Sequence, residues 1–246
     1  MAQKESADKH IRFSKYVLIW DWDGTLIDTI GYKYKGIWRD VFFSEKGKQK
    51  AVIDFLETPE GRRVNRYGLI KHALLSTDRP QLEDMPDNAL MHRPEIKYYV
   101  ARYEKFSEEA VIKRRIFPGV KDILEKLHRQ GYPMYIVSGG GTDRDLGRMA
   151  RKVGVAHYFK GIFGFGQGAF ASFGKSENFK RVAKTEDEKD PAHYVFIGDS
   201  ESDYKLSQSV GSKFLGIPNK WNKWKDKTEM QKILVYNINK LPLFLV

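Results

Sequence analysis

Residues 16–25 read YVLIWDWDGT, a short apolar run that ends in two aspartates, a glycine and a threonine. A brief apolar run closed by Asp and Gly predicts a buried strand that ends in a turn. Side chains alternate along a strand, so Asp21 and Asp23 are expected to point the same way at its end. Two carboxylates this close repel each other unless a cation or a shared proton relieves them. Mg²⁺, which prefers carboxylate and carbonyl oxygens, would do so.

Beyond residues 117–119, Phe-Pro-Gly, the pattern becomes an alternation of short apolar runs and amphipathic stretches. Helices are predicted at residues 120–130, 143–153, 176–184 and 201–209, and further strands at 133–137, 158–163, 193–197, 213–216 and 233–235. Strands that alternate with helices favour right-handed crossovers and a parallel sheet. The sequence therefore predicts an α/β fold with helices on both faces of the sheet.

The stretch between these two parts has a different character. From about residue 29 to residue 114 the chain is charged, apolar residues recur at helical spacing, and prolines punctuate it. This pattern predicts an all-helical insertion of several helices. The predicted organisation is an N-terminal extension at residues 1–15, a core at 16–28 and 115–246, and a helical domain at 29–114.

Four polar signals fall just after predicted strands or at helix starts: Asp21, Ser138, Lys175 and Asp199. Ligands of parallel sheets bind beyond the carboxyl ends of the strands, where folding would gather these residues. An aspartate there can attack phosphorus, and a second can protonate the leaving oxygen. Taken singly, each signal is more typical of a turn, a loop, an exposed lysine or a helix cap. Their joint order on one framework favours a phosphoryl-transfer site.

These residues resemble the motifs of the haloacid dehalogenase (HAD) superfamily of phosphatases. The first motif, D-x-D-G-T, matches residues 21–25, and the fourth, G-D-x-x-x-D, matches residues 198–203. The second, an apolar strand that ends in Ser or Thr, matches residues 135–139, and the third, a lysine before a helix, best matches Lys175. The resemblance covers about residues 16–245. It implies a Rossmann-like core, with an insertion similar to the helical cap of the phosphoglycolate-phosphatase and β-phosphoglucomutase branch.

The resemblance implies roles for three residues of the first motif: Asp21, Asp23 and Thr25. Asp21 would be the nucleophile and a Mg²⁺ ligand. Asp23 would be the general acid and base, and would also bind Mg²⁺ through its backbone carbonyl. Thr25 would lie on the substrate side and help to orient Asp23. True dehalogenases of the superfamily lack the second aspartate of this motif, so Asp23 indicates phosphoryl transfer.

The other motifs supply the rest of the expected site. Ser138 and Gly139 would bind the phosphoryl group, and Lys175 would stabilise both that group and Asp21. Asp199 would bind Mg²⁺ directly, and Asp203 would complete the metal site in support of it.

The match departs from the family in two places. Trp22 replaces the more usual phenylalanine, which indicates a change in packing. No proline follows Lys175, so Lys160 and Lys180 remain alternatives for the third motif.

Substrate choice is expected to depend on the insertion. A cationic helical face there could meet a distal charge of the substrate or could simply be solvated; it comprises Arg62, Arg63, Arg66 and His72. Residues 163–173, rich in glycine and aromatic residues, could be a substrate loop or a packed turn. Trp221 and Trp224, which lie among lysines, could stack on nucleic-acid bases or pack structurally.

Composition limits the other functions. The chain contains 246 residues, 43 basic and 32 acidic, with a net charge of +11 and no cysteine. Thiol catalysis and thiolate metal sites are thereby excluded. No apolar segment is long enough for a signal peptide or a membrane span, which favours a cytoplasmic protein without a membrane partner. The positive charge attracts anions, either phosphorylated metabolites or nucleic acid.

The leading hypothesis is a Mg²⁺-dependent phosphatase that hydrolyses a small phosphomonoester through an aspartyl-phosphate. A phosphomutase acting on a sugar phosphate would use the same residues. A nucleic-acid-binding protein, with or without end-phosphatase activity, is a less favoured alternative. A non-catalytic scaffold is disfavoured because every catalytic position is retained.

Overall fold

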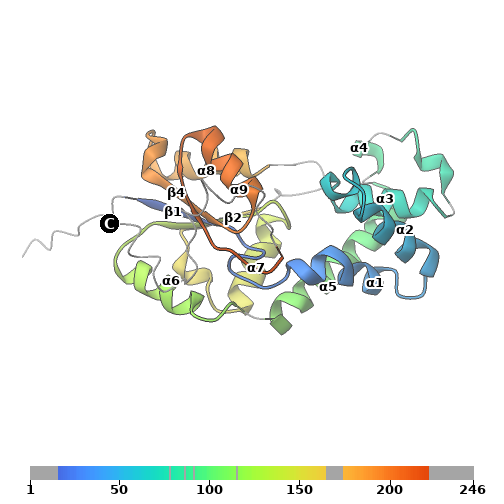
Figure 1. The fold of residues 1–246 in the computed structure, drawn as a ribbon, viewed down its shortest axis with the longest axis horizontal. Coiled ribbons are helices and arrows are strands. Elements are labelled where there is room, and N and C mark those ends of the chain that lie inside the picture. Colours follow the sequence, from blue (N-terminus) through green and yellow to red (C-terminus); the bar gives the residue numbers. More distant parts are fainter. Residues whose placement is uncertain are drawn as a thin grey trace, which may run out of the picture.

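The computed structural model describes residues 16–77, 79–85, 87–90, 92–114, 116–164 and 174–221. Figure 1 shows an α/β core at one end of an elongated molecule and a group of helices at the other. Among the described residues, no helix is both long and apolar enough to cross a membrane.

The core is built on a five-stranded parallel sheet, which confirms the predicted fold class. Its strands are β1 (Val17–Trp20), β2 (Met134–Val137), β3 (Gly161–Phe163), β4 (Tyr194–Gly198) and β5 (Lys213–Gly216). Their order in the sheet is β3-β2-β1-β4-β5, so β1 is central and pairs with β2 and β4. From β1 the chain first adds β2 and β3 on one side and then β4 and β5 on the other, so the switch point lies between β1 and β4. Ligands of such sheets bind at the carboxyl ends of the strands near the switch point.

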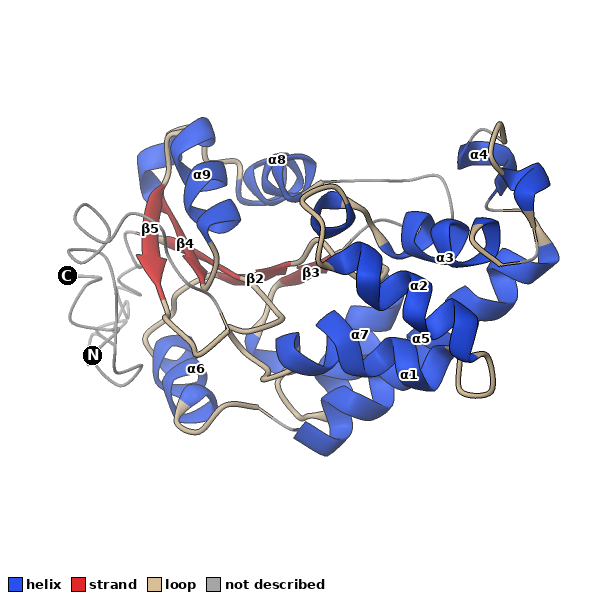
Figure 2. Cartoon of the chain, turned by 45° about the vertical axis from the view of Figure 1, so that its right-hand side comes forward, coloured by secondary structure: helices blue, strands red, loops and turns tan. Residues whose placement is uncertain are grey.

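Helices cover both faces of the sheet (Figure 2). One face is covered by α6 (Val120–Arg129) and α7 (Asp143–Lys152), the other by α8 (Lys175–Glu186) and α9 (Glu201–Val210). Because alternate residues of β1 face opposite sides, Leu18 and Trp20 belong to the first hydrophobic cluster and Val17 and Ile19 to the second. Trp22 is fully buried in the first cluster, which confirms its packing role.

One predicted strand starts later in the structure than expected. The strand predicted to begin at residue 158 begins at Gly161 instead, because Ala156–Tyr158 form a 3₁₀ turn. The predicted strand at 233–235 and most of the 163–173 segment lie outside the described residues.

In the described residues of the inserted region, helices are joined by turns and short loops, without a β-strand. It contains α1 (Ile37–Val41), α2 (Lys46–Leu56), α3 (Arg66–Leu75), α4 (Asp87–Leu90) and α5 (Pro94–Arg114). It opens with a π-helical turn, Tyr32–Gly36, and has a hydrophobic cluster of its own around Trp38 and Phe42. The α5 helix also contacts α7, which joins the inserted region to the core. The exact domain limits at residues 28/29 and 114/115 remain a prediction.

Candidate active site

The polar residues predicted to converge do so at the carboxyl edge of the sheet. Asp21 follows β1 and its N–H donates to the Ile197 carbonyl of β4 at 2.9 Å. Asp199 follows β4 directly, Ser138 follows β2, and Lys175 is the first residue of α8. Asp21, Ser138 and Asp199 are all buried. The strand ends therefore bring together residues more than 170 positions apart.

Lys175 joins two carboxylates of this edge. Its Nζ lies 2.6 Å from Asp21 Oδ1 and 2.5 Å from Asp203 Oδ1. A lysine at a helix N-terminus opposes the helix dipole, and these two carboxylates offset that repulsion. Burial alone would lower the pKa of the Lys175 ammonium, but Asp203 and Asp21 together raise that pKa above its usual value.

The alternative lysines of the third motif pair elsewhere. Lys160 pairs with Glu186, and Lys180 pairs with Glu177 on the exposed side of α8. Lys175 is therefore the lysine that the fold brings to Asp21.

The loop after β2 lies beside Lys175. A Cβ added at Gly139 would stand 3.8 Å from Lys175 Cε, an ordinary contact. Ser138 is 2% exposed, and its Oγ accepts a hydrogen bond from the Gly140 N–H at 3.2 Å. The loop continues into α7, whose N-terminus is capped by Thr142. Glycines with backbone N–H groups ahead of a helix N-terminus suit phosphoryl oxygens.

Asp203 has two structural partners. Its Oδ2 accepts from the Ser200 N–H and Oγ in a capping box that starts α9, and its Oδ1 binds Lys175. A Cβ at Gly198 would lie 2.7 Å from Asp203 Oδ2, so a glycine there allows this approach. Asp203 is thus fixed by both of its oxygens.

Three buried carboxylates form a group that could hold a metal ion: Asp21, Asp199 and Asp203, with one oxygen of each within 4.8 Å of the others. Burial raises the pKa of Asp21 well above its usual value, opposed by Lys175 and reinforced by Asp203 and Asp199. Burial and Asp203 raise the pKa of Asp199 to about 6. A hard cation relieves this repulsion, so the donor set suits Mg²⁺ chemically.

The turn after Asp23 depends on a glycine. Gly24 has φ +83°, which favours glycine, and a Cβ there would lie 2.3 Å from Asp199 Oδ2. This close approach places the first motif against the fourth.

The structure places Thr25 beside Asp199. It is fully buried, and its hydroxyl donates to Asp199 Oδ1 at 3.3 Å and not to Asp23. Thr25 thus contacts a carboxylate of the candidate metal site, and its role toward the substrate and Asp23 stays a prediction.

Asp23 is held by residues that the sequence did not single out. Lys33 Nζ lies 2.7 Å from its Oδ1 and 2.9 Å from its Oδ2, and the Thr29 hydroxyl donates to Oδ1. The side chain of Asp23 does not belong to the three-carboxylate group. The contribution of its backbone carbonyl to a metal site stays a prediction. A lysine in a helical turn carries no distinguishing sequence signal, so Lys33 needed the tertiary structure.

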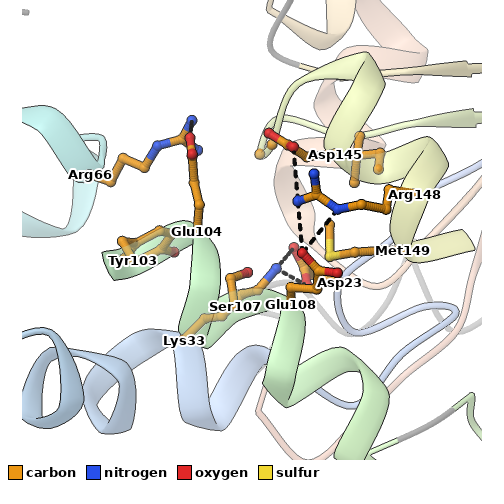
Figure 3. Close-up of a pocket in the computed structure, with 13 residues that line it drawn as sticks. Asp23, Lys33, Arg66, Tyr103, Glu104, Ser107, Glu108, Asp145, Arg148 and Met149 are labelled. Atoms are coloured by element: carbon orange, nitrogen blue, oxygen red, sulfur yellow. Dashed lines mark hydrogen bonds and ion pairs between the residues drawn. The ribbon is translucent and has the colours of Figure 1, made fainter. Parts of the chain in front are cut away.

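A small pocket of about 60 Å³ opens from Asp23 between the core and the inserted helices (Figure 3). Arg66 and Glu104 stand on the side of the inserted helices, and Arg148 and Asp145 stand on α7. A neighbouring pocket joins Arg66 to the loop glycines after Ser138. The pocket thus extends from Asp23, near the carboxyl edge of the sheet, toward the inserted helices.

The residues of the predicted cationic face lie in different surroundings in the structure. Arg66 lines the pocket, with its guanidinium 5.2 Å from the Tyr67 ring centroid and 5.8 Å from that of Tyr103. Arg62 binds the carbonyls of α2 and its C-terminus, and His72 stacks on Phe55. Arg66 is therefore the described member that faces the candidate site.

Trp221 is 44% exposed and contacts the start of the inserted region, so both interpretations of it remain open. Its indole Nε1 donates to Asp28 Oδ1 at 3.0 Å, and its ring lies against Gly31. Trp224 lies outside the described residues.

Residues 17–211 match the family model of the haloacid dehalogenase-like hydrolases. The chain belongs to this family. This HAD-like hydrolase is 25% identical over 221 residues to a phosphoglycolate phosphatase of Pseudomonas fluorescens (strain Pf0-1), covering 89% of the chain and 75% of that protein.

Solved structures share the HAD fold. YfnB of Bacillus subtilis, classed as a HAD hydrolase, superposes with a TM-score of 0.64 at 18% identity, over 94% of this chain and 99% of its own. That structure is described as bound to magnesium and as revealing interdomain movement. A protein assigned as a β-phosphoglucomutase from Thermotoga maritima gives 0.63 at 18% identity, over 94% and 98% of the two chains. These likenesses confirm the fold class predicted from the sequence.

Proposed function

We propose that this HAD-like hydrolase is a Mg²⁺-dependent phosphatase that releases phosphate from a small phosphomonoester. The observation that carries the proposal is the contact of Lys175 with Asp21 beside the buried group of three carboxylates. A cation site and a nucleophile at the same strand end are what phosphoryl transfer needs. The phosphatase relative supports this reaction.

In the first step, the Asp21 carboxylate attacks phosphorus and the bond from phosphorus to the ester oxygen breaks. Asp23 gives its proton to the departing oxygen, which leaves as an alcohol. In the second step, Asp23 takes a proton from water, whose oxygen attacks the phosphorus of the aspartyl-phosphate. The acyl phosphate bond breaks, phosphate departs, and the Asp21 carboxylate is regenerated.

The chain supplies groups that favour this course. Lys175 neutralises charge on Asp21 and on the phosphoryl oxygens, and the glycine N–H groups after Ser138 receive those oxygens. Asp21, Asp199 and the carbonyl of Asp23 would hold Mg²⁺, with Asp203 in support through Lys175. When bound, Mg²⁺ supplies positive charge that stabilises the oxygens of the transferring group.

The pocket suggests which part of the substrate the inserted helices meet. Arg66 lies 3.5 Å from Glu104 Oε1, a long pair beside the two tyrosine rings. A planar guanidinium donates well to carboxylate, phosphate or hydroxyl oxygens. We assign Arg66 to the part of the substrate distal to the phosphoryl group.

The deciding experiment measures phosphate release from phosphorylated metabolites, nucleotides and an aryl phosphate, with Mg²⁺ and with chelator. Asp21→Asn should abolish Mg²⁺-dependent release, since an amide cannot serve as the nucleophile. Asp122→Asn, on the exposed face of α6, is the matched control and should leave the rate unchanged. Activity retained in Asp21→Asn would refute the mechanism. Isomerised sugar phosphate without released phosphate would indicate a mutase instead.

A further inference from the structure

A segment that belongs to none of the four motifs contacts the candidate metal site. Residues 217–221 leave β5, and Asn219 donates from Nδ2 to Asp199 Oδ2 at 2.6 Å and to the Gly24 carbonyl at 3.0 Å. Its Oδ1 accepts from the Trp221 N–H at 2.8 Å. Because both partners of Nδ2 are acceptors, the orientation of this amide is determined by its contacts.

The Asp199 carboxylate is held from both sides by this arrangement. Asn219 binds Oδ2, Thr25 donates to Oδ1 at 3.3 Å, and the backbone of Gly24 closes against Oδ2. Asp199 is 1% exposed, so water cannot readily replace the amide donor. These contacts fix the rotation of the carboxylate about its Cβ–Cγ bond.

The segment that carries Asn219 is itself fastened at both ends. The Ile217 N–H donates to the Gly198 carbonyl at 2.8 Å, directly before Asp199. At the other end, the Trp221 indole binds Asp28, and its ring covers Gly31, where an added Cβ would lie 2.3 Å from the ring. Asn219 is therefore supported from the core strand and from the start of the inserted region.

We propose that Asn219 is a positioning residue that holds the Asp199 carboxylate in the orientation needed to bind Mg²⁺; this inference rests on the function proposed above. An asparagine that only shaped its own turn would bind its own segment. Here both donor bonds reach segments 20 and 195 positions away in the sequence, and both partners belong to motifs of the site. Partners that orient a metal ligand contribute about 10–100-fold to metal affinity in proteins.

The experiment is a calorimetric titration of the full-length protein with Mg²⁺, without substrate. Asn219→Ala should weaken the Kd for Mg²⁺ by about 10-fold or more. Activity should recover toward the wild-type kcat at high Mg²⁺, because the catalytic groups are intact. If the alanine variant does not fold, Asn219→Leu removes the same hydrogen bonds while keeping the branched shape of the side chain.

Two control variants distinguish a specific effect on Mg²⁺ affinity from a general loss of stability. Lys220→Ala changes the exposed neighbour in the same segment. Val182→Ala opens a cavity in the hydrophobic cluster between the sheet and α8. Both should bind Mg²⁺ like the wild type, although the second is less stable. A folded Asn219 variant with the wild-type Kd would overturn the inference and leave the phosphatase proposal intact. A wild-type protein that neither binds Mg²⁺ nor releases phosphate would refute both.

Discussion

Lys33 holds both carboxylate oxygens of Asp23, at 2.7 and 2.9 Å. Lys33 lies in the π-helical turn at the start of the inserted region, whereas Asp23 follows the central strand of the core. The proposed acid and base is thus oriented by the segment that leads into the inserted helices. A displacement of that segment would therefore change the orientation of the Asp23 carboxylate.

Lys33→Met should therefore impair proton transfer more than phosphoryl binding. We expect kcat for an alkyl phosphate to fall by about 10-fold, less than the loss of about 100-fold or more for Asp23→Asn. An aryl phosphate, whose leaving group needs little protonation, should lose far less. Steady-state kinetics on both esters checks this. Equal losses on the two esters would show that Lys33 does not act through Asp23.

Lys175→Ala should lower both stability and activity, because it leaves Asp21 and Asp203 buried without their shared cation. Breaking such a buried pair costs about 3–5 kcal/mol. The loss would appear as a reduced free energy of unfolding in denaturant titrations with chelator, and Mg²⁺ should restore part of it. Lys180→Ala removes an exposed pair on the same helix and should change stability little. Wild-type stability in Lys175→Ala would contradict the contact geometry.

The carboxylate group predicts a pH dependence of the metal-free protein. Burial raises the pKa of Asp199 from 3.8 to about 6, so the folded state keeps this proton after the unfolded state has lost it. Stability should therefore fall as the pH rises through that window, and Asp21, whose pKa burial also raises, contributes in the same direction.

Mg²⁺ binds the ionised carboxylates, so its stabilising effect should grow over the same pH interval. Thermal unfolding at a series of pH values, with chelator and with Mg²⁺, measures both trends. Asp199→Asn should flatten the metal-free dependence. A Mg²⁺ effect that is larger at about pH 5 than at about pH 7 would contradict the assigned sign.

Arg66→Ala should reduce kcat/KM for the preferred substrate by about 10–100-fold, the range for a lost hydrogen bond to a charged group. A minimal aryl phosphate, which has no polar distal group, should be affected far less. Arg62→Ala, which alters a neighbouring arginine that binds carbonyls outside the pocket, is the matched control. Similar effects of both substitutions would remove Arg66 from substrate recognition.

The sequence by itself determined the order and chemistry of the core. Alternating short apolar runs and amphipathic helices indicate a parallel sheet, because buried strands and one-sided helices each leave a distinct local pattern. Asp21, Ser138, Lys175 and Asp199 could be located in the same way, since each stands at a strand end or a helix start. Each of these signals depends only on residues within a few positions of it along the chain.

The tertiary structure decided the contacts between distant segments. Lys175 was distinguished from Lys160 and Lys180 only by its contact with Asp21. The contact of Thr25 with Asp199 was likewise visible only in the fold. Lys33 and Asn219 belong to no local pattern, so neither could be singled out in advance. Side-chain hydrogen bonds between segments depend on how helices and strands pack, and local sequence does not encode that geometry.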